Sequence, residues 1–475
     1  MKQFRVTFQK DLSVMVAEGS TILQAQIAAG IRPDAPCGGN GNCGKCKVML
    51  DGQEVLACQT IVNRNMAVTV KQEENVNVLT SGLSVQTLPD GESSYVLAFD
   101  IGTTTVVVYL LDGHSGVLLA QESCLNPQSQ FGADVISRIQ YYLSGKGKAL
   151  NSCIRTALEE LADQVCQKAK ISPSDIGAAA IAGNTAMHHL LMDIDPQPLV
   201  TPPYMPAVFD AIEKNGTRIL PNIAGFVGGD TVGCMVSTRL DKQEKLTLLV
   251  DIGTNGEMVL GNNHRRIACS TAAGPAFEGA KISCGMRGAR GAVDHVWLEN
   301  GEIKYHVIGD TTPKGLCGSG LLDLVAVLLD TGILDESGYL EEKKYTLCES
   351  VVLTQKDIRE VQLAKAAIRA GIELLAEQFG VEVSDIQQVW LAGAFGNYLN
   401  PASACRIGMI PPVLQSRIQS IGNAAGEGAK LCALSRAEFA YSQILARETE
   451  FLELASLPNF QDCYVDSLEF EECAL

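Results

Sequence analysis

Four cysteines near the start of the chain have the residue type and the spacing of metal ligands. They are Cys37, Cys43, Cys46 and Cys58, in the pattern C-x5-C-x2-C-x11-C. Four thiolates can hold an iron–sulfur cluster or a structural zinc ion, but structural zinc sites usually draw on two short C-x2-4-C pairs. Only Cys43 and Cys46 form such a pair, and the glycines around them let backbone amides approach sulfur. The pattern therefore favours an iron–sulfur cluster over zinc.

The residues around these cysteines predict the elements that position them. Residues 4–8 and 12–16 alternate apolar and polar side chains, as paired strands do, and residues 20–29 have a helical pattern capped by Ser20 and closed by Gly30. Two strands, a helix and a cysteine-rich loop is the order of a β-grasp ferredoxin. The segment resembles plant-type ferredoxins, and its short final interval resembles the cluster domains of succinate dehydrogenases and molybdenum hydroxylases. The resemblance implies a 2Fe-2S cluster held by all four cysteines.

One motif that occurs twice indicates a second kind of chemistry. YVLAFDIGTTTVVVYLLD and LTLLVDIGTNGEMVLG each predict a strand that ends in an aspartate, a tight turn and a second strand. The aspartates are Asp100 and Asp251, and the turn residues are Gly102, Thr103, Thr104 and Thr105 in the first copy and Gly253, Thr254, Asn255 and Gly256 in the second. Such turns can bind phosphate oxygens, and the aspartates can hold a hydrated Mg²⁺. Two copies predict two lobes that clamp one polyphosphate, and neither copy has the sequence of a P-loop or a Rossmann loop.

These loops and three other segments resemble the ATPases of the actin, sugar-kinase and heat-shock-chaperone superfamily. GGDTVGCMVSTRLDKQEK resembles a helix that connects the two lobes, and the resemblance implies that Asp230 acts near the attacking water, together with Asp100 and Asp251. QQVWLAGAFGNYLNP resembles the adenosine-contacting motif, which implies nucleotide contacts from Gly393, Ala394, Phe395 and Gly396. IGNAAGEGAKLCALS resembles the second connecting helix, whose small residues permit close packing at a hinge. The resemblance implies ATP and Mg²⁺ as ligands.

Two segments between the second loop and the adenosine motif are not needed merely to hold ATP. CSTAAGPAFEGAKISCGMRGARG resembles a segment of dehydratase-activating ATPases, and by position Glu278 and Lys281 are candidates for nucleoside contacts. GDTTPKGLCGSGLLDLVAVLL predicts a turn that enters an apolar helix. With GNTAMHHLL and the cluster domain, these segments resemble the ATP-dependent reductive activators of corrinoid proteins.

The resemblance to corrinoid activators implies a particular reaction. In that family one electron passes from the cluster to a Co(II) corrinoid on a methyl-transfer partner, which regenerates Co(I), while ATP binding and hydrolysis drive complex formation and release. The implied partners are a corrinoid-binding methyl-transfer protein and an upstream low-potential electron donor, and a homodimer is compatible with the family. Three other functions stay open: a small-molecule kinase with a regulatory cluster, a dehydratase-activating ATPase, and a nucleotide-sensing redox partner protein.

The composition limits the partners and the location. Lys and Arg number 37 against 54 Asp and Glu, which gives a net charge of −17 with no basic block, so we expect no binding to nucleic acid or to an anionic membrane. The chain contains no apolar run of transmembrane length, and its first residues do not resemble a signal peptide. We therefore expect a cytoplasmic protein, in which most of the 16 cysteines are buried thiols.

The predicted fold class is α+β. We expect a β-grasp ferredoxin-like domain followed by a two-lobed actin-like α/β ATPase with a duplicated ribonuclease H-like fold. The expected parts are the ferredoxin-like domain (1–71), a linker (72–94), ATPase lobe I (95–245), ATPase lobe II (246–388), the adenosine motif with a return helix to lobe I (389–446) and an acidic C-terminal tail (447–475).

Overall fold

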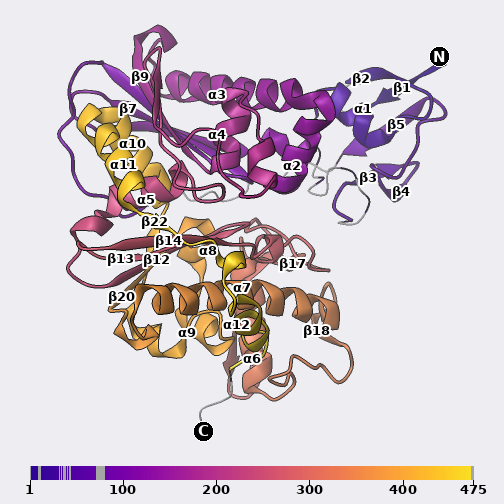
Figure 1. Cartoon of the computed structure of the whole chain (residues 1–475). Helices are drawn as coiled ribbons and strands as arrows, with labels where there is room; N and C mark the ends of the chain where they lie inside the picture. Colours follow the sequence, from indigo (N-terminus) through magenta and orange to yellow (C-terminus); the bar gives the residue numbers. More distant parts are fainter. Residues whose placement is uncertain are drawn as a thin grey trace.

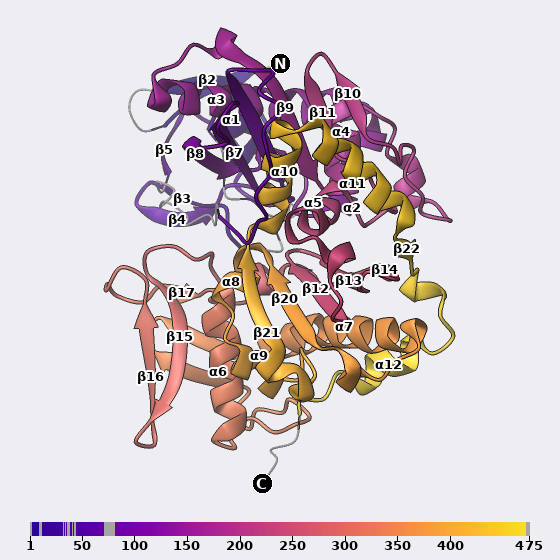
Figure 2. The ribbon, with the colours of Figure 1, turned by 90° about the vertical axis from the view of Figure 1, so that its left-hand side faces the viewer.

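The chain folds into a small N-terminal domain and two larger lobes (Figure 1). The computed structural model describes residues 2–8, 12–31, 33, 35, 39, 41, 44–70 and 81–471. Of the predicted cluster ligands, Cys46 and Cys58 are among the described residues, whereas Cys37 and Cys43 lie outside them. The two lobes stack on each other and the small domain lies beside the first (Figures 1 and 2).

The N-terminal domain is a five-stranded sheet, ordered β2-β1-β5-β3-β4, with one helix. Strands β1 and β2 form the predicted antiparallel hairpin, and β1 pairs in parallel with β5. Apolar side chains of the strands and the helix, such as Val6, Ile22 and Val48, form its core. The elements are β1 (Gln3–Thr7), β2 (Ser13–Ala17), α1 (Ile22–Ala28), β3 (Lys47–Leu50), β4 (Gln53–Leu56) and β5 (Met66–Val70). This arrangement confirms the ferredoxin-like fold.

Helix α1 is capped one residue later than the sequence pattern predicts. Thr21 is the N-cap in place of Ser20: its Oγ1 accepts a hydrogen bond from the Gln24 backbone N at 3.2 Å, and Gln24 Oε1 accepts one from the Thr21 N at 2.9 Å. Either hydroxyl could cap a helix, but only Thr21 has a Gln three residues later to complete a capping box.

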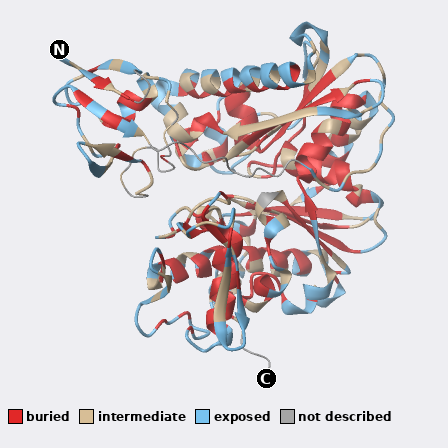
Figure 3. Ribbon diagram, turned by 180° about the vertical axis from the view of Figure 1, so that it is seen from behind, coloured by how far each residue is buried: buried red, intermediate tan, exposed pale blue. Residues whose placement is uncertain are grey.

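Lobe I is a six-stranded sheet ordered β10-β11-β9-β6-β7-β8, with helices on both faces. Leu97, Phe99 and Val108 pack with α2, α3 and α4 on one face, whereas Val96 and Ala98 pack with α5, α10 and α11 on the other. The outer side of α3 is exposed, as Figure 3 shows. The elements are β6 (Tyr95–Ile101), β7 (Thr105–Asp112), β8 (Leu118–Leu125), α2 (Val135–Tyr141), α3 (Gly147–Ala169), β9 (Ile176–Gly183), α4 (Thr185–Met192), β10 (Ile212–Lys214), β11 (Thr217–Ile219), α5 (Gly229–Thr238), α10 (Ala424–Leu434) and α11 (Arg436–Glu448).

Lobe II has a second six-stranded sheet, ordered β21-β20-β12-β13-β14-β22. Its largest core is formed with α6 and α7 and includes Leu248, Val250 and Leu321. The elements are β12 (Thr247–Ile252), β13 (Gly256–Gly261), β14 (Arg266–Thr271), β15 (Ala292–Glu299), β16 (Glu302–Val307), β17 (Gly315–Leu316), α6 (Gly318–Asp330), β18 (Lys344–Cys348), β19 (Val351–Thr354), α7 (Gln355–Phe379), β20 (Gln388–Ala392), α8 (Gly393–Tyr398), α9 (Pro401–Arg406), β21 (Ile418–Gly422), β22 (Glu450–Phe451) and α12 (Phe460–Asp466).

The two lobes repeat one topology, which confirms the duplicated actin-like fold. In each lobe three antiparallel strands, β6-β7-β8 or β12-β13-β14, are followed by a parallel strand, β9 or β20, beside the first. The register places Asp100 opposite Val107 and Ala182, and places Asp251 opposite Glu257 and Ala392. Each aspartate therefore lies at the same end of an equivalent central strand.

Helices α5 and α10 cross at the boundary between the lobes. At the crossing point they are so close that a residue with a side chain would clash with the backbone of the other helix. A Cβ built on Gly428 would lie 2.1 Å from the Gly233 carbonyl oxygen, and one on Gly233 would lie 2.9 Å from the Ala425 oxygen. Glycine at both positions lets the backbones of the two helices touch. This agrees with the close packing that the small residues of the second connecting helix predicted.

Residues 447–471 fold onto lobe II. Their acidic composition predicted a separate tail, which the structure does not have in this region. Strand β22 pairs with β14, and α12 packs against α7. The buried Lys365 ammonium donates a hydrogen bond to the Glu469 carbonyl and lies against the ring of the buried Phe470. Cys473 lies outside the described residues. Within the described part of the chain no helix has the length and apolar character of a membrane span.

Candidate nucleotide and cluster sites

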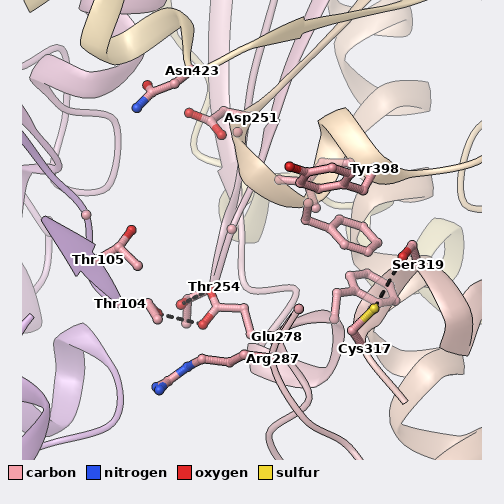
Figure 4. Close-up of a pocket in the computed structure, with 18 of the residues that line it drawn as sticks. Thr104, Thr105, Asp251, Thr254, Glu278, Arg287, Cys317, Ser319, Tyr398 and Asn423 are labelled. Carbon is pink, nitrogen blue, oxygen red and sulfur yellow. Dashed lines mark hydrogen bonds between the residues drawn. The ribbon is translucent and has the colours of Figure 1, made fainter. Parts of the chain in front are cut away.

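A cavity of about 450 Å³ lies between the two lobes and receives residues from both (Figure 4). Its lining includes Asp100, Asp230 and the first loop from lobe I, and Asp251 and the second loop from lobe II. The predicted site residues that line it are Asp100, Gly102, Thr103, Thr104, Thr105, Asp230, Asp251, Gly253, Thr254, Asn255, Glu278, Gly393 and Phe395. Gly256, Lys281 and Gly396 are not part of this lining, and the side chain of Ala394 lies outside the described part of the chain.

Each loop is closed by one backbone hydrogen bond from its glycine, but the two turns differ in length. Gly102 N donates to the Thr105 carbonyl, three residues on, at 2.9 Å, whereas Gly253 N donates to the Asn255 carbonyl, two residues on, at 2.9 Å. Both turns bring side-chain hydroxyls, those of Thr104 in the first loop and Thr254 in the second, toward the same space (Figure 4). Such a pair of facing loops can hold a polyphosphate from two sides.

Four carboxylic acids converge on the inner end of the cavity. The pKa is raised to about 6 for Asp100 and Asp230 and to about 7 for Asp251, mainly by burial, and the charges of neighbouring carboxylates contribute to the shifts of Asp100 and Asp251. Burial and the charges of Asp230 and Asp251 also raise the pKa of Glu257, a residue that the sequence analysis did not single out. Among the described residues no three metal-ligating side chains lie close enough to hold one metal ion directly, so a divalent ion that accompanies a nucleotide would be held at this end of the cavity through water, by the charge of the ionised carboxylates.

Two asparagines hold the first phosphate loop in place, and the sequence analysis missed both. Asn184 caps α4 and donates from Nδ2 to Thr103 Oγ1 at 3.0 Å; Asn423 caps α10 and donates from Nδ2 to Asp100 Oδ2 at 2.9 Å. Both lie directly after a strand, in the related sequences GNTA and GNAA. This repeat was the signal that could have revealed them.

We predict that Asn423→Ala lowers the rate of ATP hydrolysis about tenfold, because Asp100 loses the group that orients it. The same change removes the α10 cap, which costs about 1 kcal/mol of stability. Asn400→Ala is the matched control, since Asn400 caps α9 through the Ala402 N at 3.0 Å and does not line the cavity. Phosphate release and thermal unfolding of both variants check the prediction; equal hydrolysis rates in the two would contradict it.

The outer end of the cavity has the character of a nucleoside pocket. The rings of Phe277 and Phe395 stack with centroids 5.0 Å apart and an interplanar angle of 1°. Tyr398 also lines the cavity (Figure 4), and Gly318 comes so close that a Cβ there would lie 2.7 Å from the Phe395 ring. Aromatic surfaces of this kind suit a flat base.

The predicted nucleoside contacts Glu278 and Lys281 lie elsewhere. Glu278 reaches the phosphate loops, where its carboxylate accepts hydrogen bonds from Thr104 Oγ1 at 2.6 Å and from Thr254 Oγ1 at 2.8 Å (Figure 4). Lys281 points away from the cavity, with its Nζ 3.6 Å from a carboxylate oxygen of Glu360. The two residues are three positions apart on a turn, and Gly279 between them has a left-handed backbone that separates their directions.

The described part of the cluster loop is suited to an iron–sulfur cluster. Cys46 and Cys58 are both buried, and a hydrogen bond of 2.8 Å from Ala57 N to the Cys46 carbonyl joins their two segments. Gly39, Gly41 and Gly44 have positive φ angles, which other residues adopt only with strain. Among the described residues no group of three metal-ligating side chains occurs, so the full ligand set depends on Cys37 and Cys43 as well.

The chain is 39% identical over 445 residues to the corrinoid activation enzyme RamQ of Eubacterium limosum, across 84% of this chain and 74% of that protein. This chain belongs to the corrinoid activation enzymes. A second member of the group, a Co(II) methylated amine-specific corrinoid protein reductase of Methanosarcina barkeri, is 28% identical over 295 residues, which is 55% of this chain and 54% of the reductase.

Family models and a solved structure agree with this membership. The models describe a 2Fe-2S iron-sulfur cluster binding domain (residues 6–63), the RACo middle region (95–243) and the C-terminal ASKHA domain of RACo (245–474). The solved structure of a reductive activator for a corrinoid, iron-sulfur protein matches with a TM-score of 0.71 and 30% identity, over 98% of each chain. The resemblance found from the sequence motifs is therefore confirmed, and the cluster domain of this corrinoid activation enzyme is of the 2Fe-2S type.

Proposed function

We propose that this protein is an ATP-driven electron-transfer activator that reduces the Co(II) corrinoid of a methyl-transfer partner protein to Co(I). The observation that carries the proposal is that one chain of the corrinoid activation family joins a ferredoxin-like domain to a two-lobed cleft lined by two phosphate loops. The cluster supplies one electron, which the partner's cobalt receives as substrate. A separate low-potential donor reloads the cluster.

The cleft couples nucleotide binding to the relative position of the lobes. The hydroxyls of Thr104 and Thr254 come from different lobes, so a polyphosphate bound to both draws the loops together. The close α5–α10 crossing at Gly233 and Gly428 is the contact about which the lobes turn. Asp100 and Asp251 would hold Mg²⁺ through water, where the ion would supply charge stabilisation to the phosphates, and Asp230 would orient the attacking water.

The free energy of ATP binding and hydrolysis can drive an electron transfer that is unfavourable by itself. Transfer of one electron against a potential difference of 100 mV costs about 2.3 kcal/mol. A protein whose affinity for the partner differs between nucleotide states can offset this cost, because the affinity difference shifts the equilibrium of the transfer.

The buried carboxylates predict a pH-dependent effect of Mg²⁺ on stability. Their folded-state pKa values of about 6 to 7 lie above those of the unfolded chain, so between about pH 4 and pH 7 the folded state binds more protons, and its stability falls as the pH rises. Mg²⁺ binds the ionised forms and offsets this loss. The rise in unfolding temperature caused by MgCl2, relative to NaCl of equal ionic strength, should be larger at about pH 7.5 than at about pH 5.5. An equal rise at both pH values would argue against a metal at this end of the cavity.

The decisive experiment mixes the reconstituted protein with a Co(II) corrinoid protein, a chemical reductant and Mg·ATP, and records the absorbance of Co(I). We expect Co(I) to accumulate only with Mg·ATP, and not with Mg·ADP or without the activator. Phosphate release without any Co(I) would instead favour a nucleotide-sensing or kinase function.

A further inference from the structure

One short segment of lobe II touches both the nucleotide cleft and the iron–sulfur domain. We call residues 278–288 the coupling segment. Glu278 at its start bridges Thr104 of lobe I and Thr254 of lobe II, and Met286, Arg287 and Gly288 at its end line the cavity. In its middle, the Gly285 carbonyl accepts a hydrogen bond of 2.5 Å from Lys45 Nζ. Lys45 directly precedes the cluster cysteine Cys46.

The Glu278 carboxylate lies between the two phosphate loops, where a phosphate anion would also bind. Both of its oxygens accept hydrogen bonds from the loop hydroxyls, one from each lobe. A phosphate group that enters between the same threonines needs those hydroxyls and carries negative charge. Two anions about 4 Å apart repel each other strongly in a partly desolvated site, so Glu278 has to move when a phosphate binds.

The backbone of the coupling segment is folded so tightly that a displacement of the Glu278 backbone is passed on to Gly285. A Cβ on Gly285 would lie 2.4 Å from the Gly279 carbonyl oxygen, and a Cβ on Gly279 would lie 2.6 Å from the Met286 N. The residue that follows Glu278 is thus in backbone contact with the residue that holds Lys45. Ser283 in between is anchored to α7, because its N donates to Asp357 Oδ1 at 2.7 Å.

The far side of the segment is fixed to β17. Met286 N donates to the Leu316 carbonyl at 2.8 Å, and Leu316 N donates to the Cys284 carbonyl at 2.8 Å. The Gly285 carbonyl lies between these two bonds, so a shift of the segment carries β17 with it and moves this carbonyl relative to Lys45. Figure 2 shows β3, the strand that follows Cys46, above the part of lobe II that contains β17.

We propose that the coupling segment reports nucleotide binding to the iron–sulfur domain: a phosphate displaces Glu278 from Thr104 and Thr254, and the displaced segment releases the Gly285 carbonyl from Lys45. The cluster loop is docked on lobe II while the cleft is empty and undocks when nucleotide binds. This inference rests on the proposed function, because it needs a phosphate ligand in the cleft and a cluster beside Lys45.

Thermodynamic linkage between nucleotide binding and the Lys45–Gly285 contact gives the proposal a test. A contact that is not coupled to the cleft would not pass it. If nucleotide binding breaks the Lys45 contact, then removal of that contact must strengthen nucleotide binding, although Lys45 does not line the cavity. For Lys45→Ala we expect the Kd of Mg·AMP-PNP, a non-hydrolysable ATP analogue, to fall about threefold. Lys47→Ala is the matched control, since Lys47 is two residues away and pairs with Glu54 inside the small domain at 2.8 Å.

The carboxylate end of the segment is tested by Glu278→Gln. The amide keeps the shape of the side chain and removes its charge, so we expect the Kd of Mg·AMP-PNP to fall about tenfold. Glu360→Gln is the control, because it removes a charge beside the same segment at Lys281 and outside the cavity. A Kd that is unchanged or higher in Glu278→Gln overturns the displacement step.

Hydrogen exchange of the full-length holoprotein separates this inference from the proposed function. We expect Mg·AMP-PNP to slow exchange in peptides that cover residues 100–106 and 251–256, and to speed exchange several-fold in peptides that cover 44–58 and 278–288. In Lys45→Ala the 44–58 peptides should exchange fast with or without the analogue. Slower exchange at the phosphate loops with no change at 44–58 overturns the coupling alone; no change at the phosphate loops overturns the nucleotide site and the coupling together.

Discussion

The Asp251→Asn variant should hydrolyse ATP about 100-fold more slowly than the wild type and should lose corrinoid reduction to the same degree. Asp251 is buried at the end of β12, beside Asp100 and Asp230, and its pKa of about 7 is raised first by burial and then by the charges of those two residues. Asparagine keeps the size of the side chain and removes the charge that stabilises Mg²⁺ between the lobes. Because the change also relieves repulsion among buried acids, the nucleotide-free variant should unfold at the same temperature as the wild type or higher.

Asp241→Asn is the matched control for this prediction. Asp241 is a buried acid as well, but it belongs to lobe I, contacts the hydroxyl of Tyr441 and Lys242 Nζ, and does not line the cavity. Phosphate release, Co(I) absorbance and the unfolding temperature of both variants give three readouts. Wild-type turnover by Asp251→Asn would reject the metal-holding role, and a similar loss in Asp241→Asn would mean that burial alone explains the effect.

Features that depend on neighbouring residues were predictable from the sequence. The two DIGT loops follow apolar strands directly, so their position at the ends of β6 and β12 follows from alternation and turn chemistry. The cysteine spacing and the flanking strands gave the ferredoxin-like fold for the same reason. The small residues of α10 indicated close helix contact, which Gly428 provides.

Features that depend on packing between distant segments were not predictable. Glu278 meets Thr104 across 174 positions of sequence, and its direction depends on the left-handed turn at Gly279. Sequence position alone placed it at the nucleoside end instead. The last residues look like an acidic tail by composition, yet Leu454 and Phe470 are buried in lobe II because α12 packs on α7.

The prediction of buried thiols holds for six of the eleven other cysteines that the structure describes, Cys166, Cys234, Cys269, Cys317, Cys405 and Cys432, whereas Cys124, Cys153, Cys284, Cys348 and Cys463 are only partly buried. Burial raises the pKa of Cys234, Cys269 and Cys432, so these sulfurs stay protonated and are poor nucleophiles and poor ligands. Cys46 and Cys58 differ from them in position: they lie in the small domain, Cys46 two residues after Gly44 and Cys58 close in space to Gly39, and both glycines have a left-handed backbone. Thiol chemistry in this part of the chain is therefore concentrated at the cluster site.

Replacement of Cys46 by serine should abolish the visible absorbance of the cluster and the formation of Co(I), while ATP hydrolysis stays within about twofold of the wild type. A hydroxyl is a poor iron ligand at neutral pH, and loss of one of four thiolates leaves the cluster incompletely held. The lobes fold around their own cores, so nucleotide binding should survive. Cys348→Ser is the control, because Cys348 lies on β18 of lobe II. This variant should retain full iron content. Full iron content in the Cys46 variant would remove this residue from the ligand set, and loss of nucleotide binding would show that the small domain is needed to fold the cleft.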